Sequence, residues 1–262
     1  MIPAIDPRCV YDLAHPLEPA MPVSPNHPGY RMALLRRHGD MVRADGGSAA
    51  NEMIMMGGHT GTHLDALAHV SQDGKLHGGV DAQAAQTGGR FTRLGVETVA
   101  PIVGRGVLID VAAENGAIDA GTPVTADDLA RAADRHRTDP SGAVAILVRT
   151  GWAKHWSTPS MYLGHESGVP GVDESGARWI AGHRPRAAGG DSMAFEHVPP
   201  GRGHALLPVH RILLVEHGIH IIENLDLEQL ARDRRYEFLF MCAPLAFIGA
   251  TGAPVRPVAV AL

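Results

Sequence analysis

An alternation of apolar runs with a capped helical pattern is the feature that most constrains the fold. Gly106–Val111 and Ala143–Val148 are rich in branched aliphatic residues and bounded by turn-forming residues, which is typical of buried strands. Between them, Thr125–His136 begins with a helix-capping residue that is followed by early acidic residues. The order strand, helix, strand predicts an α/β protein in which strands dominate.

Further elements are predicted along the whole chain. Asp173–His183 carries apolar residues at three- and four-residue spacing, which indicates a second helix. We find no internal repeat, low-complexity tract or linker, so we expect residues 1–262 to form a single domain. The remaining predicted strands are Val10–Leu13, Met53–Met56, Ile219–Ile222, Tyr236–Met241 and Val255–Val260.

Charge and composition exclude several classes of partner. The net charge is -5 and no run of Lys or Arg exceeds a pair, so we expect neither nucleic acid nor a membrane surface as a partner. Cys9 and Cys242 lie far apart, which favours a reducing compartment over a disulfide scaffold or a zinc ribbon. The N-terminus lacks the pattern of a signal peptide, and prolines interrupt the apolar region 238–262, so we expect a cytoplasmic protein.

The densest chemistry lies in the segment 58–69, which reads GHTGTHLDALAH. A helix is a poor interpretation because glycines recur in and just before the segment, and because no Glu follows the first His. In an extended chain, alternate side chains point the same way, so His59, His63 and Asp65 would share one face. A turn into helix at Asp65 would keep His69 beside them. The pattern therefore predicts a cation site.

Two imidazole nitrogens and a carboxylate with an open position are typical of catalytic zinc or manganese. A lone His-x-x-x-His pair is more often surface or hydrogen-bonded core, but four groups in one short segment favour ligand chemistry. The chain holds 16 histidines, and most of the others are expected to be solvent-facing or turn residues. These are His15, His27, His38, His77, His136, His155, His165, His183, His197, His204 and His217.

The segment from His59 to His69 resembles the signature of the cyclase-like metal-dependent hydrolases, the group that includes bacterial kynurenine formamidase and isatin hydrolase. This resemblance implies a swivelling β/β/α domain, with a strand-rich core and peripheral helices. It also implies a homodimer or homotetramer with active sites near subunit contacts. The similarity extends through Gly106–Asp110, Val148–Trp152, Gly190–Ser192, Ile222–Asp226 and Gly249–Pro257.

The resemblance also implies roles for individual residues. His59, His63 and Asp65 would bind a first Zn²⁺ or Mn²⁺, and His69 would be the catalytic acid/base just outside the coordination sphere. A second metal would use His210 and Glu223 together with the bridging aspartate, although some family members work with one metal. The alternatives are that Glu223 is a helix N-terminal acid and that His210 is an ordinary core or surface histidine.

The substrate prediction rests on two departures from the formamidase pattern. Leu67 stands where formamidases usually have proline, and Gly189–Glu196 differs from their Asp-Thr-Pro-Ser pattern. We therefore expect hydrolysis of a cyclic amide or lactone by metal-activated water, with arylformamidase action on N-formylkynurenine and a non-catalytic metal-stabilised binding protein as alternatives. Residues expected to contact substrate, unless they are plain packing, are Asp191, Ser192, Phe195 and Trp152, with Trp156 and Tyr30 as further aromatic wall.

Overall fold

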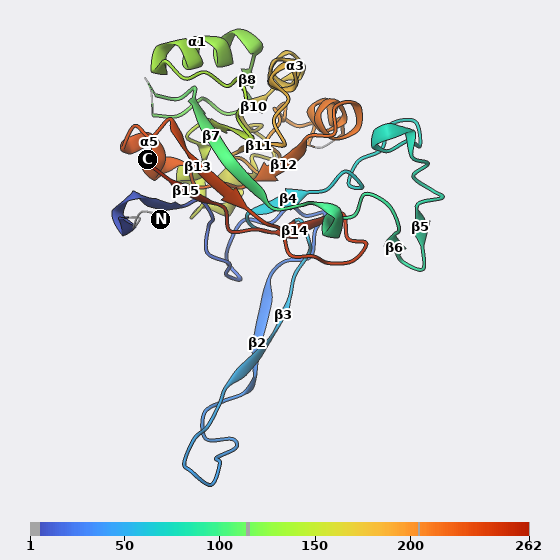
Figure 1. The fold of residues 1–262 in the computed structure, drawn as a ribbon, viewed down its shortest axis with the longest axis vertical. Coiled ribbons are helices and arrows are strands. Elements are labelled where there is room, and N and C mark those ends of the chain that lie inside the picture. The colour runs from blue at the N-terminus through green and yellow to red at the C-terminus, as the bar shows by residue number, and fades with distance from the viewer. Residues whose placement is uncertain (1–5, 114–115, 204, 262) are drawn as a thin grey trace, which may run out of the picture.

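The structure is a computed structural model that describes residues 6–113, 116–203 and 205–261. His204, expected to be a solvent-facing or turn residue, lies outside these ranges. A nine-stranded sheet runs through the molecule in the order β1-β15-β13-β7-β9-β11-β12-β4-β14 (Figure 1). Its strands are Val10–Asp12 (β1), Val258–Val260 (β15), Glu237–Cys242 (β13), Ile102–Asp110 (β7), Ala145–Arg149 (β9), Ala187–Gly190 (β11), His220–Glu223 (β12), His63–Asp65 (β4) and Gly252–Pro254 (β14).

The middle of the sheet is parallel and its two margins are antiparallel. Strands β7, β9, β11 and β12 run parallel to one another, whereas β4 is antiparallel to both β12 and β14. Helix α1 (Ala126–His136) connects β7 to β9, and α3 (Glu174–His183) lies between β9 and β11 in the chain. Both predicted helices and the strand–helix–strand unit are confirmed.

Alternation along the central strands divides the core between the two faces of the sheet. Ile146 and Val148 of β9 pack with Leu129 of α1 and Ile180 of α3 on the helical face. Leu147, which points the other way, belongs to a second core cluster. These layers confirm the α/β fold with a strand-rich core and peripheral helices.

Local signals fix the start of each of the two longer helices. The hydroxyl of Thr125 accepts a hydrogen bond from the backbone N–H of Asp128, and the Asp128 carboxylate accepts one from the Thr125 N–H, which forms a capping box. Asp173 caps α3 in the same manner by accepting from the N–H of Gly176. Both helices end at a residue in the left-handed conformation, Arg137 for α1 and Arg184 for α3.

The remaining elements are short. No helix in the described ranges is long and apolar enough to cross a membrane. The shorter helices are α2 (Pro159–Leu163), α4 (Pro208–His210) and α5 (Glu228–Arg232), the π-helix Arg211–Glu216, and the 3₁₀ turns Pro7–Cys9, His77–Gly79, Val96–Thr98 and Trp152–His155. Two small pairs of strands are β8 (Pro123–Val124) with β10 (Gly171–Val172), and β5 (Gln86–Thr87) with β6 (Arg90–Phe91).

One hairpin stands apart from the rest of the molecule. Strands β2 (Arg31–Arg36) and β3 (Asn51–Met55) pair antiparallel and project away from the sheet as a long arm (Figure 1). Every residue of both strands is exposed. Strand β3 falls where Met53–Met56 predicted a strand, whereas β2 was not predicted.

Candidate metal centre

Strand β4 carries two of the predicted ligands. His63 and Asp65 are two residues apart on this strand, so their side chains share one face. In the antiparallel pairing of β4 with β12, Glu223 lies directly opposite His63. Glu223 is thus the last residue of a strand rather than a helix N-terminal acid, and the sheet register brings it to the His63 side chain.

His59 and His69 flank β4 in turns. The predicted extended run from residue 59 to residue 65 is wrong before residue 63, because Gly61 adopts a left-handed conformation with φ of 69°. No helix starts at Asp65 either, since the N–H of His69 instead closes a turn on the carbonyl of Ala66. The two turns nevertheless fold back on each other, and the rings of His59 and His69 stack with centroids 4.0 Å apart.

Asp65 is the centre of the cluster. Its Oδ1 accepts a hydrogen bond from Nδ1 of His59 at 2.7 Å and lies 3.5 Å from Nε2 of His63. Its Oδ2 lies 3.6 Å from Nε2 of His210. This Oδ2 is buried and has no hydrogen-bond partner among the described residues. A buried polar atom normally has a partner, so an Oδ2 without one is expected where the carboxylate binds a cation.

Two groups of ligand atoms share Asp65. The candidate donors of His59, Asp65 and His69 lie within 4.8 Å of one another, as do those of His63, Asp65 and Glu223. His210 joins the second group, because its Nε2 lies 3.2 Å from Oε1 of Glu223. The arrangement brings together all six residues that were predicted as metal ligands or as the acid/base. The prediction grouped His63 with His59, whereas the structure places its donor atom with that of Glu223.

Hydrogen bonds behind the cluster orient His63. Its Nδ1 donates to the carbonyl of Gly61 at 2.8 Å, so its Nε2 faces the carboxylates with a free lone pair when the ring is neutral. The same carbonyl accepts from Nδ2 of Asn224 at 3.0 Å. Asn224 in turn accepts from the hydroxyl of Tyr162 at 2.8 Å, which ties this support to the core.

A buried carboxylate does the same for His210. Nδ1 of His210 donates to Oε2 of Glu196 at 2.5 Å, and the backbone N–H groups of His210 and Val209 also bond to this carboxylate. Glu196 therefore fixes both the short helix α4 and the imidazole ring on it. Neither Glu196 nor Asn224 was predicted as a site residue, although Glu196 lies 14 residues before His210 and Asn224 directly follows Glu223.

The ionisation of the cluster follows from burial and from its carboxylates. Burial by itself lowers the pKa of His63, but hydrogen bonds to Asp65 and Glu223 raise that pKa to about 10. The pKa of His210 is raised well above its usual value, again against the effect of burial, by the nearby carboxylate of Asp65 and by the bond to Glu196. His69 has no such bond, and burial lowers its pKa to about 4.

The donor set fits a divalent cation. Three buried carboxylates, those of Asp65, Glu196 and Glu223, need compensating positive charge. Without a metal, protons on His63 and His210 supply this charge. A divalent ion would supply the same charge and leave both rings neutral, which is the state in which imidazole acts as a ligand. Imidazole nitrogen and carboxylate oxygen are donors that suit zinc and manganese.

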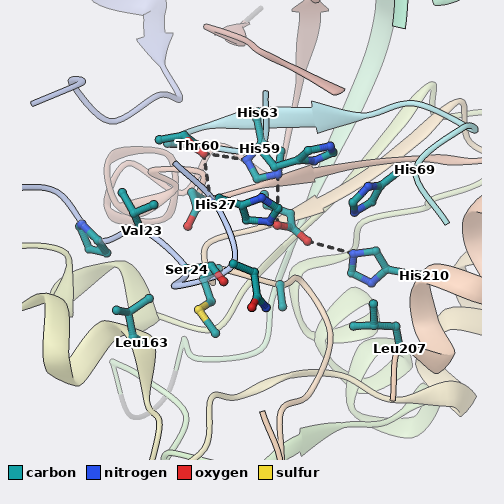
Figure 2. Close-up of a pocket in the computed structure, with 17 residues that line it drawn as sticks. Val23, Ser24, His27, His59, Thr60, His63, His69, Leu163, Leu207 and His210 are labelled. Atoms are coloured by element: carbon teal, nitrogen blue, oxygen red, sulfur yellow. Dashed lines mark hydrogen bonds and ion pairs between the residues drawn. The ribbon is translucent and has the colours of Figure 1, made fainter. Parts of the chain in front are cut away.

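A cavity of about 270 Å³ opens over the cluster (Figure 2). Its polar side is formed by His59, His63, His69, His210 and Glu223. His27 lies in a turn, as expected, but its ring faces this cavity and stacks on His59 with centroids 5.4 Å apart. The rest of the lining is Pro22, Val23, Ser24, Asn26, Thr60, Gly61, Leu163, Met193, Ala194, Leu207 and Asn224.

The residues expected to contact substrate lie outside this lining. Asp191 is fully buried and accepts hydrogen bonds from the backbone N–H groups of Thr150 and Gly151. Burial raises its pKa to about 6. The buried side chains of Ser192, Phe195 and Trp152 do not line the cavity either, and nor do Trp156 and Tyr30. The described lining contains no Phe, Tyr or Trp, so the predicted aromatic wall is replaced by aliphatic side chains.

The family follows from comparison with known proteins. The family model described as "Putative cyclase" matches residues 11–197, which is more than half of the chain. The chain belongs to this cyclase family. The resemblance carried by the segment from His59 to His69 is therefore confirmed, and the matched region holds that whole segment together with Glu196.

Similar structures and sequences span nearly the whole cyclase-family chain. A crystal structure described as a novel cyclase has a TM-score of 0.85 and 30% identity, and the match covers 96% of this chain and 88% of the other. Isatin hydrolase A from Ralstonia solanacearum has a TM-score of 0.72 at 22% identity, with 97% and 92% covered, and shows the fold. Cyclase-like protein 2 of Oryza sativa subsp. japonica is 25% identical over 256 residues, which cover 95% of this chain and 78% of that protein.

Proposed function

We propose that this protein is a metal-dependent hydrolase that opens a small, uncharged cyclic amide or lactone. The observation that carries the proposal is the buried Oδ2 of Asp65, which has no hydrogen-bond partner among the described residues and lies 3.6 Å from Nε2 of His210, one of the imidazole groups that line the cavity. The fold is shared with isatin hydrolase A, whose name states hydrolysis of isatin.

The metal would be held by donors of both groups that share Asp65. We propose Zn²⁺ or Mn²⁺ at the shared Asp65, with His59 from one group and His63 from the other as the imidazole ligands, and with Glu223 and His210 available for a second ion. Such an ion lowers the pKa of bound water and polarises a carbonyl oxygen, and this is the chemistry that hydrolysis of an amide or ester needs.

His69 is proposed as the acid/base. Its ring lines the cavity and stacks on His59, and no hydrogen bond to another described residue occupies either of its nitrogens. A neutral imidazole in that position accepts a proton from water and delivers it to the departing nitrogen or oxygen of the opened ring. A positioned general base contributes roughly 10²–10⁴-fold to a rate.

The lining of the cavity argues for an uncharged substrate. Val23, Leu163, Met193 and Leu207 form its apolar part, and no Lys or Arg side chain is among the described lining residues. N-formylkynurenine carries a carboxylate and an ammonium group, which would need charged partners in a largely desolvated cavity. The arylformamidase reaction is therefore the less favoured alternative, and it is tested with the same substrate panel.

Metal content and turnover test the proposal together. We expect purified protein to contain Zn²⁺ or Mn²⁺, to lose hydrolysis of isatin-type lactams or unsaturated lactones on chelation, and to regain it when the metal is returned. Aryl formamides serve as the comparison substrates. Chelation that melts the protein, combined with no turnover of any class, would instead support a non-catalytic metal-stabilised protein.

A variant at His69 separates catalysis from metal binding. We expect His69→Ala to retain metal while the rate falls about 10²–10⁴-fold, because the ring moves protons and is not needed to hold the ion. His217→Ala is the matched control, since His217 is exposed and lies outside the cavity lining. Full activity in His69→Ala would refute the assignment of the base.

A further inference from the structure

One edge of the cavity is polar but belongs to neither group of ligand atoms. Outside the metal cluster, the polar side chains among the described lining residues are those of Ser24, Asn26, His27, Thr60 and Asn224 (Figure 2). Thr60 and Asn224 already bond to neighbouring groups of the chain. No described residue forms a hydrogen bond with the side chains of Ser24, Asn26 or His27, so these three offer free donors and acceptors to an occupant of the cavity.

The sequence Ser-Pro-Asn-His fixes these side chains in a β-turn. The carbonyl of Ser24 accepts a hydrogen bond from the backbone N–H of His27 at 2.9 Å. Pro25 occupies the first central position of the turn, where its restricted φ is favourable. The carbonyl of Pro28 then anchors the end of the turn by accepting from the hydroxyl of Thr60 at 3.0 Å. The donors and acceptors are thus held in place before a ligand binds, which lowers the entropy cost of binding.

The turn and the proposed acid/base lie on different sides of His59. The rings of His27 and His69 both stack on that of His59, with centroids 5.4 and 4.0 Å away, and Figure 2 shows them on either side of it. A ring that places one carbonyl beside His69 therefore presents its opposite edge to the turn. Leu163 and Leu207 supply an aliphatic wall, so the cavity suits a ring with apolar faces and one polar edge.

We propose that the turn Ser24–His27 recognises the substrate and that this substrate is a cyclic imide, a ring in which one N–H lies between two carbonyl groups. The inference rests on the proposed hydrolase function and narrows its substrate class. The amide of Asn26 offers an acceptor oxygen next to N–H donors, so it pairs at two points with an adjacent N–H and carbonyl of the ring. The imidazole of His27 adds a donor to the same carbonyl. A lactone lacks the N–H and a simple lactam lacks the second carbonyl, so either would leave part of the turn unpaired.

Opening of an imide ring needs no co-reactant besides water. Water adds to the carbonyl carbon beside His69, and His69 accepts the proton that this water gives up. The bond between that carbon and nitrogen then breaks, and the nitrogen keeps the electron pair and takes the proton from His69. The product carries a primary amide at one end and a carboxylic acid, which ionises at neutral pH, at the other. Hydrogen bonds from the turn to the second carbonyl also stabilise the negative charge that the leaving nitrogen shares with it.

Two imides that differ only in the N–H test this recognition on metal-loaded wild-type protein. After correction for their rates without enzyme, kcat/KM for glutarimide should exceed that for N-methylglutarimide at least about fivefold, because one hydrogen bond is worth roughly two- to tenfold and the methyl group would press on the turn. The difference should appear in KM, since the bond forms before the ring opens. Equal values of kcat/KM would overturn the inference, whereas turnover of lactams or lactones would leave the hydrolase function standing.

Variants of the turn assign the two contacts. Asn26→Ala should bring the corrected preference for glutarimide close to one, because it removes the acceptor of the N–H. His27→Phe keeps a ring against His59 but loses the donor, so KM for both imides should rise roughly two- to tenfold. His217→Phe, at an exposed site outside the cavity lining, is the matched control and should change neither value.

The outcomes separate the recognition role from the reaction itself. Turn variants that bind metal and keep both wild-type values would overturn the inference. Should these variants fail to fold, the comparison of the two imides on wild-type protein decides. A metal-loaded wild type that opens no imide, lactam or lactone would refute the hydrolase function together with the inference.

Discussion

Replacing Glu196 by Gln isolates what the buried carboxylate behind His210 contributes to metal binding. Glu196 is 1% exposed and accepts the Nδ1–H of His210 at 2.5 Å. Gln keeps the shape and one acceptor oxygen, which can still accept from both the backbone N–H and the Nδ1–H of His210, but it removes the negative charge. Its –NH2 group replaces the oxygen that accepts the long 3.4 Å bond from the N–H of Val209, so the change weakens the charge-assisted bond that orients the imidazole and gives up this one backbone contact.

The expected magnitude follows from that single bond. A hydrogen bond to a charged group contributes about 1.5–3 kcal/mol and a neutral bond about 0.5–1.5 kcal/mol, so the substitution costs about 1–1.5 kcal/mol. Since about 1.4 kcal/mol corresponds to a factor of ten, the affinity for metal should fall roughly tenfold. This lies at the lower end of the roughly 10–100-fold loss that follows removal of a partner hydrogen-bonded to a metal-binding histidine.

Competition with a chromophoric chelator measures this affinity directly. Glu237→Gln is the matched control, because Glu237 is exposed at the start of β13, where it pairs with Arg105, and the change should leave the affinity unchanged. The reasoning would be refuted by a Glu196→Gln protein that folds normally and binds metal as tightly as wild type. That result would mean that His210 is not a ligand or that Glu196 does not orient it.

Three other predictions concern the same fold. Metal loading at pH 7 should release protons from His63, whose pKa is about 10 without metal, and from His210, whose pKa is also raised, so affinity should rise by up to about a hundredfold per pH unit and calorimetric heats should depend on the buffer. Gly252→Ala should weaken metal binding because its Cβ would lie 2.5 Å from Cε1 of His59, whereas Gly182→Ala, with open space around it, should not. Thr125→Ala should lower the free energy of unfolding in urea by ~1 kcal/mol through loss of the α1 cap, and an unchanged midpoint would contradict that role.

Local patterns predicted the long elements of the fold well. Helix α1 begins after the predicted cap at Thr125, and β7 and β9 fall within a few residues of the predicted apolar runs. Strand β11 was not predicted, because its sequence Ala-Ala-Gly-Gly has no branched or aromatic side chain. It is a strand because its backbone pairs with β9 on one side and with β12 on the other. Strand β2 was not predicted either, although its apolar side chains resemble those of a buried strand.

In the candidate site, too, the residues of one short segment could be predicted, whereas contacts between distant segments could not. The segment from His59 to Asp65 fixed the donor types, but Gly61 bends the chain, so neither a helix nor an extended strand describes the geometry. Glu196 joins the cluster through tertiary packing alone, which no spacing rule encodes. Sequence reasoning expected aromatic side chains around substrate, yet the folded loops present Leu163 and Leu207 to the cavity instead.

The donor cluster and the cavity wall depend on different kinds of structure. Asp65 and Glu223 lie on paired strands, and a slip of one residue between β4 and β12 would turn one of them to the opposite face. Sheet register thus makes the donor set rigid and intolerant of insertion. The opposite wall comes from the root of the arm at Val23 and from loops that carry Met193 and Leu207. Because these segments can change without disturbing the register, substrate preference can diverge within the cyclase fold while the metal chemistry is kept.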